Sequence, residues 1–230
     1  MRLTSKIIIK GTFKVKTGLR IGAGNNDFEL GTPQLSVVRS KGIPFVPGSS
    51  LKGKMRSLLA RYYGSSRVEN DVDIIKEIFG DSAGKENGQF RTRLLVRDCS
   101  LIQSEKKNEP LTETKWENVI KRMQGGAIHP REVERVPEGS EFSFELVYDE
   151  YNHVTKTENQ DNLSSENQSH LKHIKLALQL LEDDYLGGCG SRGYGKIEFC
   201  KDKMSITQHK IESEIYNKVG TPLTNGFVWD

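Results

Sequence analysis

The chain has 230 residues and a mass of 26.0 kDa, which suits one large domain, and we expect a single domain over residues 1–230. Its hydrophobic fraction is 35% and its mean hydropathy is −0.58, and no apolar run approaches the roughly 20 residues of a membrane-spanning helix. Cys99, Cys189 and Cys200 share no short spacing, which excludes a disulfide framework and a zinc-finger pattern. We therefore expect a cytoplasmic protein with no membrane partner.

The net charge of +3 conceals an uneven distribution of charge along the chain. Residues 1–67 hold 13 Lys/Arg and two acidic residues, which gives +11, whereas residues 68–230 hold 21 basic and 29 acidic residues, which gives −8. A basic first third predicts one cationic face for a polyanion such as a nucleic acid. The alternative is that folding mixes these charges into an ordinary solvated surface.

Strand and helix patterns alternate through the first third of the chain. Apolar and polar residues alternate over 6–16, which predicts a strand, and further extended segments are expected at 35–39 and 43–47. Ser49 or Ser50 is the expected N-cap of a helix that ends at Gly64. The apolar stripe of this helix consists of Leu51, Met55, Leu58, Leu59 and Tyr62.

The remaining elements complete a recognisable order. A short helix is expected at 74–79, a longer one at 171–181, and strands are expected at 90–98, 142–148 and 196–200. The order strand, helix, strand, strand, helix, strand predicts an α+β fold with a ferredoxin-like (RRM-like) β-α-β-β-α-β core and additional loops. Two segments interrupt it: an insertion at 103–140, and a polar segment at 151–169 that is expected to be a flexible loop.

The segment Val46–Arg56 combines a turn, two hydroxyl groups and a helix N-terminus. Free amides and the helix dipole favour an anion at this point, and three cations follow. Gly53 inside the helix costs about 1 kcal/mol relative to Ala, which suggests that a backbone or nucleotide approaches it closely. The alternative is a capped helix with solvated lysines. The predicted phosphate contacts are Ser49, Ser50, Lys52, Lys54 and Arg56.

A glycine-rich segment, Leu186–Gly195, contains the spacing G-x-G-x-x-G. A dinucleotide site needs a strand before this pattern and a helix after it, and here the order is reversed, so we exclude that reading. Backbone amides at Gly188, Gly190 and Gly193 could still approach phosphates, with Arg192 pairing to them. The alternative is a tight structural turn.

The insertion at 103–140 carries basic residues beside apolar ones around Gly125-Gly126. Such a projection could place apolar side chains between bases while arginines hold the backbone, or it could be a subunit-docking arm. The residues predicted to contact RNA here are Arg122, Met123, Ile128 and Arg131. His170 and His173 are spaced i, i+3 on the second long helix, but no third ligand is evident, so we expect both to be solvated.

These segments together resemble the RAMP superfamily, the repeat-associated proteins of CRISPR systems. More narrowly, the chain resembles the backbone subunits of type III CRISPR effector complexes, the third Csm subunit and its relatives. The resemblance covers nearly the whole chain. It is carried by Thr17–Gly22, Val37–Arg39, Ile43–Arg56, Glu113–Asn118, Pro130–Val136 and Gly187–Gly195.

The resemblance implies a subunit that forms a filament with further copies of itself and binds crRNA. Target RNA and other type III effector subunits are the remaining implied partners. A thumb within 103–140 would displace one base pair at regular intervals of the guide–target duplex. Arg20 and Arg39, which lie in the resembling motifs, join the implied RNA contacts.

The chain departs from the family pattern at one position that concerns catalysis. Members that cut target RNA carry an aspartate in the pattern G-x-x-D-x-x-V-V-R, and Gln34 occupies that position here. Glutamine offers neither a carboxylate ligand nor a useful general base. Arg20 likewise stands where the family often has a histidine. We therefore predict an RNA-binding scaffold with no catalytic residue and no cofactor. The alternative is a metal-dependent endoribonuclease that uses Asp27 with Mg²⁺ or another divalent cation.

Overall fold

The computed structural model describes residues 2–23, 36–81, 91–102, 110–120, 122–123, 125–152 and 165–223. Its helices are α1 (Gly48–Tyr62), α2 (Asp73–Phe79) and α3 (Ser165–Asp183), with 3₁₀ turns η1 (Val68–Asn70), η2 (Gly190–Arg192) and η3 (Lys201–Lys203). Its strands are β1 (Arg2–Val15), β2 (Arg39–Ser40), β3 (Ile43–Val46), β4 (Leu94–Val96), β5 (Cys99–Ile102), β6 (Glu113–Ile120), β7 (Ala127–Arg135), β8 (Glu141–Asn152), β9 (Ile197–Phe199), β10 (Ser205–Glu212), β11 (Ile215–Tyr216) and β12 (Thr221–Pro222). None of the described helices is long and apolar enough to cross a lipid bilayer.

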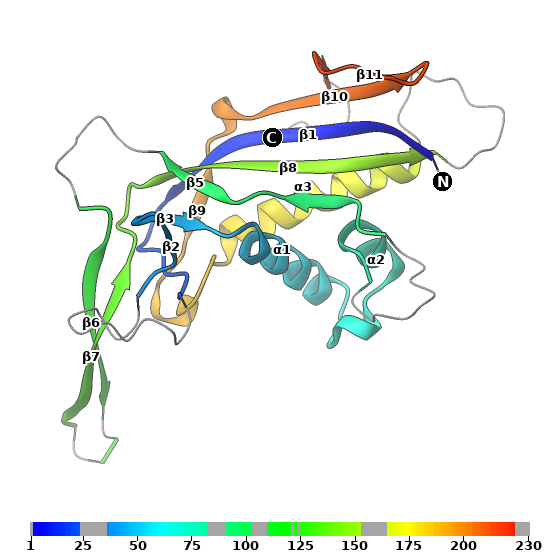
Figure 1. Ribbon diagram of the computed structural model, residues 1–230. Coiled ribbons are helices and arrows are strands. Elements are labelled where there is room, and N and C mark those ends of the chain that lie inside the picture. Colours follow the sequence, from blue (N-terminus) through cyan, green and yellow to red (C-terminus); the bar gives the residue numbers. More distant parts are fainter. Residues whose placement is uncertain are drawn as a thin grey trace.

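One large antiparallel sheet is built around the long pair β1 and β8 (Figure 1). The order along the sheet is β11-β10-β1-β8-β5-β3-β2. Strands β9 and β10 pair with the same edge of β1, at 13–15 and 5–10, so they follow one another along it. Strands β4 and β5 do the same along β8. The α+β prediction is therefore confirmed in its coarse form, an antiparallel sheet with three helices.

Helices α1 and α3 lie side by side on one face of this sheet (Figure 1). Period-two burial in β1 directs one set of side chains toward them, while apolar stripes at helical spacing face back from the helices. Burying each of these large aliphatic side chains stabilises the fold by about 1.5–3 kcal/mol. The core includes Ile7, Ile9, Phe13, Leu51, Met55, Leu59, Leu171, Ile174 and Leu178.

The insertion contains a hairpin, β6–β7, that forms its own two-stranded sheet and projects away from the main sheet (Figure 1, lower left). Its pairing shifts register between Glu117 and Val119. At its base, Leu19 and Val136 form an isolated antiparallel bridge in which each backbone N–H donates to the other's carbonyl, at 2.9 and 2.8 Å. This bridge ties the hairpin to the segment that follows β1.

The structure corrects three expectations about element boundaries. Strand β8 continues to Asn152 and α3 already begins at Ser165, so the ends of the expected loop at 151–169 are regular structure. Residues 153–164 of that expectation lie outside the described residues. The strand expected at 90–98 is only Leu94–Val96, and three strands after residue 204 were not anticipated. Their side chains lack the clear alternation that marks β1.

Candidate nucleic-acid interface

The N-terminus of α1 is capped differently from the sequence-based expectation. The helix begins at Gly48, with Pro47 as N-cap residue, and neither Ser49 nor Ser50 makes a side-chain cap. Instead, the Gly48 amide donates to the Asp98 carboxylate at 2.8 Å. A Cβ at Gly48 would lie 2.2 Å from the Val96 carbonyl oxygen, so only glycine fits here, and the helix begins two or three residues earlier than it would with a serine N-cap. The serine-cap prediction is wrong, because the carboxylate of Asp98, in the connection between β4 and β5, accepts from the first helical amide instead.

The three cations of α1 have different surroundings. Arg56 pairs with the buried Asp71 carboxylate at 2.7–2.8 Å, and Lys54 lies 3.4 Å from Asp184. Lys52 has no ion-pair partner among the described residues, and burial of its stem, aided by the charge of Arg56, lowers its pKa. Arg56 therefore holds the segment after α1 in place, whereas the Lys52 ammonium group has no carboxylate opposite it among the described residues.

The glycine-rich segment Gly187–Gly195, called here the glycine loop, is a tight turn fastened to the end of β1. The Gly188 amide donates to the Arg20 carbonyl at 2.9 Å, and the Gly195 amide donates to the Gly18 carbonyl at 3.1 Å. The Gly193 amide donates to the Gly190 carbonyl. Two of the predicted phosphate donors, Gly188 and Gly193, would thus have to exchange partners to bind a phosphate. Left-handed φ values occur at Gly187, Cys189, Gly193 and Gly195.

The glycine loop contacts α1 through one aromatic ring. The ammonium group of Lys54 lies 3.6 Å from the ring centroid of Tyr185, a cation–π contact. Gly190 of the glycine loop packs against the same Tyr185 ring, because a Cβ at Gly190 would lie only 2.1 Å from it. Only glycine lets the loop approach the ring this closely. The structure therefore brings together Lys54 and the glycine loop, which are more than 130 residues apart in the sequence.

The glycine loop also contacts the hairpin, through a buried carboxylate. Glu117 of β6 accepts a hydrogen bond from Arg192 at 2.5 Å and one from Arg131 of β7 at 3.4 Å. Tyr194, which is 1% exposed, directs its hydroxyl at the same carboxylate. Burial raises the pKa of Tyr194 to about 12, and Glu117 adds to the shift. On the other side of the loop, the Arg20 guanidinium lies 3.9 Å from the Cys189 sulfur.

Arg39 occupies the opposite face of the hairpin base. Its guanidinium pairs with Glu134 and lies 3.1 Å from the Thr112 hydroxyl. Burial alone would raise the pKa of Glu134, but hydrogen bonds from the Val37 amide, Thr112 and Arg39 outweigh it and lower the pKa. Arg39 therefore stabilises a buried carboxylate in the protein itself.

The far end of the hairpin exposes apolar side chains. Met123 is 97% exposed and Ile120 is 68% exposed, and Arg122 is exposed beside them. Ile128 lies in β7, but its side chain is outside the described part of the structure. The exposed residues fit the sequence-based picture of a projecting apolar tip with a basic residue next to it.

Two of the residues named from the sequence concern cleavage of target RNA. Gln34 and Asp27 both lie in the segment 24–35, outside the described residues.

The charge division between the first third and the rest of the chain is partly cancelled by folding. Within the described part of the chain, seven of the 13 basic residues in 1–67 form ion pairs with acidic residues beyond position 67. The seven are Lys6, Lys10, Lys16, Arg39, Lys54, Arg56 and Arg61. The cationic surface is therefore smaller than the sequence count indicates.

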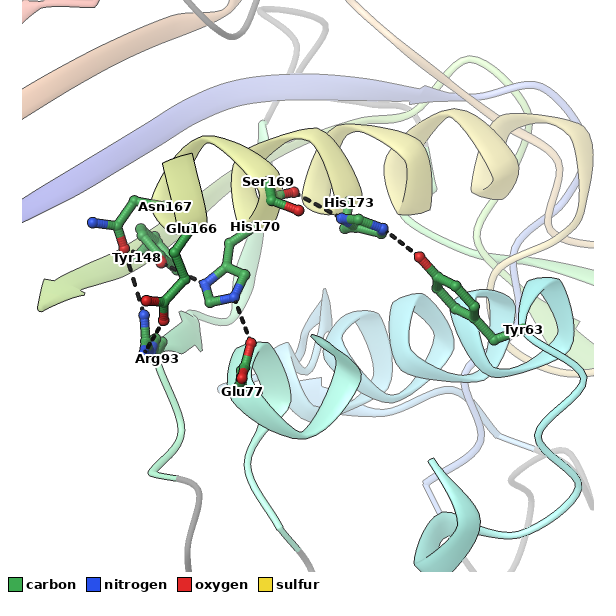
Figure 2. Close-up of polar contacts among 9 residues, drawn as sticks. All are labelled: Tyr63, Glu77, Arg93, Tyr148, Glu166, Asn167, Ser169, His170 and His173. Atoms are coloured by element: carbon green, nitrogen blue, oxygen red, sulfur yellow. Dashed lines mark hydrogen bonds and ion pairs between the residues drawn. The ribbon is translucent and has the colours of Figure 1, made fainter. Parts of the chain in front are cut away.

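The expectation that both histidines are solvated is wrong for His170. Its ring is fully buried between β8 and α2, with Nδ1 2.7 Å from the Tyr148 hydroxyl and Nε2 2.9 Å from the Glu77 carboxylate (Figure 2). Burial lowers the pKa of His170, the nearby Arg93 adds to this shift, and Glu77 opposes it. His173, one turn on, contacts the Tyr63 hydroxyl instead (Figure 2).

Glu77, Glu166 and His170 form the one group with metal-like spacing among the described residues, with ligand atoms within 4.8 Å of one another. The Arg93 guanidinium lies 2.6 Å from Glu166 and points into the group (Figure 2). This arginine already supplies the positive charge that a cation would bring. The group is therefore a closed polar network that joins α2 to α3, and it lies apart from the cationic surface.

Sequence reasoning missed the residues that organise this surface. Asp98, Glu117, Asp184 and Tyr185 were not singled out, and Tyr194 was noted only as part of the glycine-rich pattern. The one available signal was alternation along β6, which places Lys115 and Glu117 on one face. That signal does not show what the face contacts.

Comparison with known proteins agrees with this architecture. The family model described as the RAMP superfamily matches residues 12–198. Curated relatives named "CRISPR system Cms endoribonuclease Csm3" include those of Mycobacterium tuberculosis (36% identical, 95% of this chain and 97% of the relative) and Streptococcus thermophilus (37%, 94% and 97%). A solved structure titled "Crystal structure of Csm3-Csm4 subcomplex in the type III-A CRISPR-Cas interference complex" matches with a TM-score of 0.62 at 29% identity, over 97% of this chain and 90% of that one. The resemblance expected from the sequence is confirmed, and the chain belongs to the RAMP superfamily.

Proposed function

We propose that this chain is a crRNA-binding backbone subunit of a type III CRISPR effector complex, which holds guide RNA and target RNA in antiviral defence. Membership of the RAMP superfamily and relatives named Csm3 support this role. The observation that carries it is the position of the glycine loop, which contacts α1 through Tyr185 and the hairpin through Glu117. The glycine loop thereby links the basic residues of α1 to those of the hairpin.

The proposed RNA contacts fall into two groups. One group, near α1 and the glycine loop, would bind guide phosphates, and the other, on the hairpin, would act as the thumb that separates base pairs. Arg39 and Arg56 are both paired with buried carboxylates, so we assign them a supporting role. The proposed contacts are Arg20, Ser49, Ser50, Lys52, Lys54, Gly190, Arg192, Arg122, Met123, Ile128 and Arg131.

The finer fold that we propose is a ferredoxin-like core. Reading across the sheet, β9, β1, β8 and β4 are neighbours in that order, which is the order 4-1-3-2 of a β-α-β-β-α-β unit. Helix α1 follows β1 and helix α3 connects β8 to β9, as this unit requires. Strands β2, β3, β5 and β10–β12 would then be additions at its edges.

The proposed partners are crRNA, target RNA, further copies of this chain and other type III subunits, in the cytoplasm. A solved structure with Csm4 in its title, and one at 16% identity titled "Cryo-EM structure of the Type III-B Cmr-beta bound to cognate target RNA", belong to such assemblies. The second likeness concerns the fold alone. Filament formation by this chain rests on the family resemblance.

RNA binding by the full chain tests the proposal. We expect Lys52→Ala to weaken binding of short single-stranded RNAs about equally for all sequences, and to reduce the salt slope by about 0.7. Lys172→Ala is the matched control, because Lys172 is exposed on α3 and outside the proposed contacts. An unchanged slope for Lys52→Ala would remove this lysine from the interface, and absence of salt-dependent RNA binding by the wild-type chain would contradict the proposed function.

A metal-dependent endoribonuclease is the second candidate, because the curated relatives carry that activity in their names. It would need Mg²⁺ or another divalent cation, whereas the scaffold role needs no cofactor. Assembled complex incubated with labelled complementary RNA and Mg²⁺ separates the two candidates. Regularly spaced fragments that disappear with Asp27→Ala would favour the nuclease, and uncut RNA would favour the scaffold.

A further inference from the structure

The contact between the glycine loop and the hairpin depends on one carboxylate, that of Glu117. The Glu117 side chain is only 9% exposed, and it receives Arg192 from η2 and Arg131 from β7. Burial alone would raise the pKa of Glu117, but the nearby Tyr194 hydroxyl and the hydrogen bonds from Arg192 and Arg131 outweigh it and lower the pKa. The carboxylate is therefore charged and fixed between two guanidinium groups from different parts of the chain.

The tyrosine beside this carboxylate makes the contact rigid. The Tyr194 ring is buried with the Lys115 ammonium 4.6 Å and the Arg135 guanidinium 5.1 Å from its centroid. Both cations belong to the hairpin, whereas Tyr194 belongs to the glycine loop. Cation–π contacts and the hydroxyl facing Glu117 thus hold the loop against one face of the hairpin.

The two guanidinium groups at Glu117 retain capacity to bind a ligand. The side chain of Arg131 is 39% exposed and that of Arg192 is 49% exposed. A guanidinium has five N–H donors in a fixed fork, and each of these bonds to Glu117 uses only part of it. The remaining N–H groups of both arginines can face a phosphate outside.

We propose that Glu117 is a positioning residue for RNA, which holds Arg131 and Arg192 at a fixed separation so that both contact the same ribose-phosphate chain. This inference rests on the proposed function. It makes the carboxylate a requirement for binding a polyanion, although its own charge repels one. Simple electrostatics gives the opposite sign, because removing a negative charge near the RNA should tighten binding.

The sign of the effect of Glu117→Gln on RNA affinity is the test. Affinity of the full chain for a single-stranded oligouridine is measured over a range of salt concentrations. We expect about tenfold weaker binding, comparable to the loss of one charge-assisted hydrogen bond, and a salt slope smaller by about 0.7. Glu113→Gln is the matched control, since Glu113 lies on β6 like Glu117, pairs with Arg135 of β7 at 2.7 Å and is more exposed. The control should bind RNA as tightly as the wild type, or slightly more tightly.

A second variant keeps the net charge constant. Glu117→Asp retains the carboxylate but shortens its side chain, so it cannot reach both guanidinium groups, and we expect weaker RNA binding here as well. Wild-type or tighter binding by both variants would overturn the inference while leaving the proposed function intact. Thermal unfolding of each variant identifies loss of fold, and additive effects of Glu117→Gln and Arg192→Ala in a double-mutant cycle would also overturn it.

Discussion

The substitution Gly53→Ala should raise the stability of the free protein and lower its affinity for RNA, so it tests the two effects separately. Gly53 lies in the interior of α1 with an ordinary helical backbone, it is exposed, and a Cβ built there meets no atom within 4 Å. Alanine should therefore stabilise the free protein by about 0.8–1 kcal/mol, since it loses less backbone entropy on folding. For a chain of this size, that corresponds to a rise in Tm of about 2–4 °C.

The same substitution should weaken RNA binding if a nucleotide approaches the helix at this point. A methyl group in a close contact costs about 1 kcal/mol, which corresponds to about fivefold lower affinity. Circular dichroism melts without RNA and titrations with short RNA measure the two quantities. Gly64→Ala is the matched control, because that site is equally open but has φ +72°, so alanine should lower the Tm. A lower Tm for Gly53→Ala would refute the helix argument, and an unchanged RNA affinity would place the RNA elsewhere.

Three further outcomes follow from buried groups. Arg56→Ala leaves the Asp71 carboxylate buried without its partner and should cost about 3 kcal/mol in urea unfolding; a loss of RNA affinity with full stability would contradict the supporting role. Gly195→Ala should cost at least about 2 kcal/mol, because its Cβ would lie 2.1 Å from the Leu186 carbonyl oxygen at φ +77°, and a wild-type melt would refute this. Burial lowers the pKa of His170, so on acidification the unfolded chain binds a proton near pH 6.5 before the folded chain does. The urea midpoint should therefore be highest above that pH and fall as the pH is lowered. A midpoint that rises on acidification would contradict this prediction.

Elements with a strong local pattern were predictable from the sequence. The alternation in β1 and the apolar stripe of α1 depend only on residues near one another in the chain, and both are seen in the structure. The start of α1 was not predictable, because Asp98, whose carboxylate accepts a hydrogen bond from the Gly48 amide, lies 50 residues away in the chain. Strand β10 is half-buried along most of its eight residues without alternation, and β11 and β12 are exposed and two residues long each, so their patterns are weak.

The candidate interface shows the same division between local and distant information. Composition identified Lys52, Arg192 and the glycine loop as residues that suit a phosphate chain, and the structure brings the loop to both α1 and the hairpin. The acidic partners of Arg192 and Lys54 could not be assigned, since Glu117 and Asp184 lie more than 70 residues from these cations in the chain. A sequence pattern gives the type of each charge but not the charge that lies opposite.

Ion pairing within the protein changes what the basic first third can contribute to RNA binding. If all 13 cations of residues 1–67 neutralised phosphates, they would contribute a salt slope of about −9 for single-stranded RNA, at about 0.7 per contact. Seven of them already face carboxylates of described residues, which leaves a contribution of about −4 from this segment if none of these pairs is exchanged. Exposed pairs contribute only about 0–1 kcal/mol each to stability, so phosphates could displace some of those carboxylates. Arg39 and Arg56 are the exceptions, because exchange there would leave Glu134 or Asp71 buried and charged without a partner. The acidic residues of the second part of the chain therefore decide which basic residues of the first part are available to RNA.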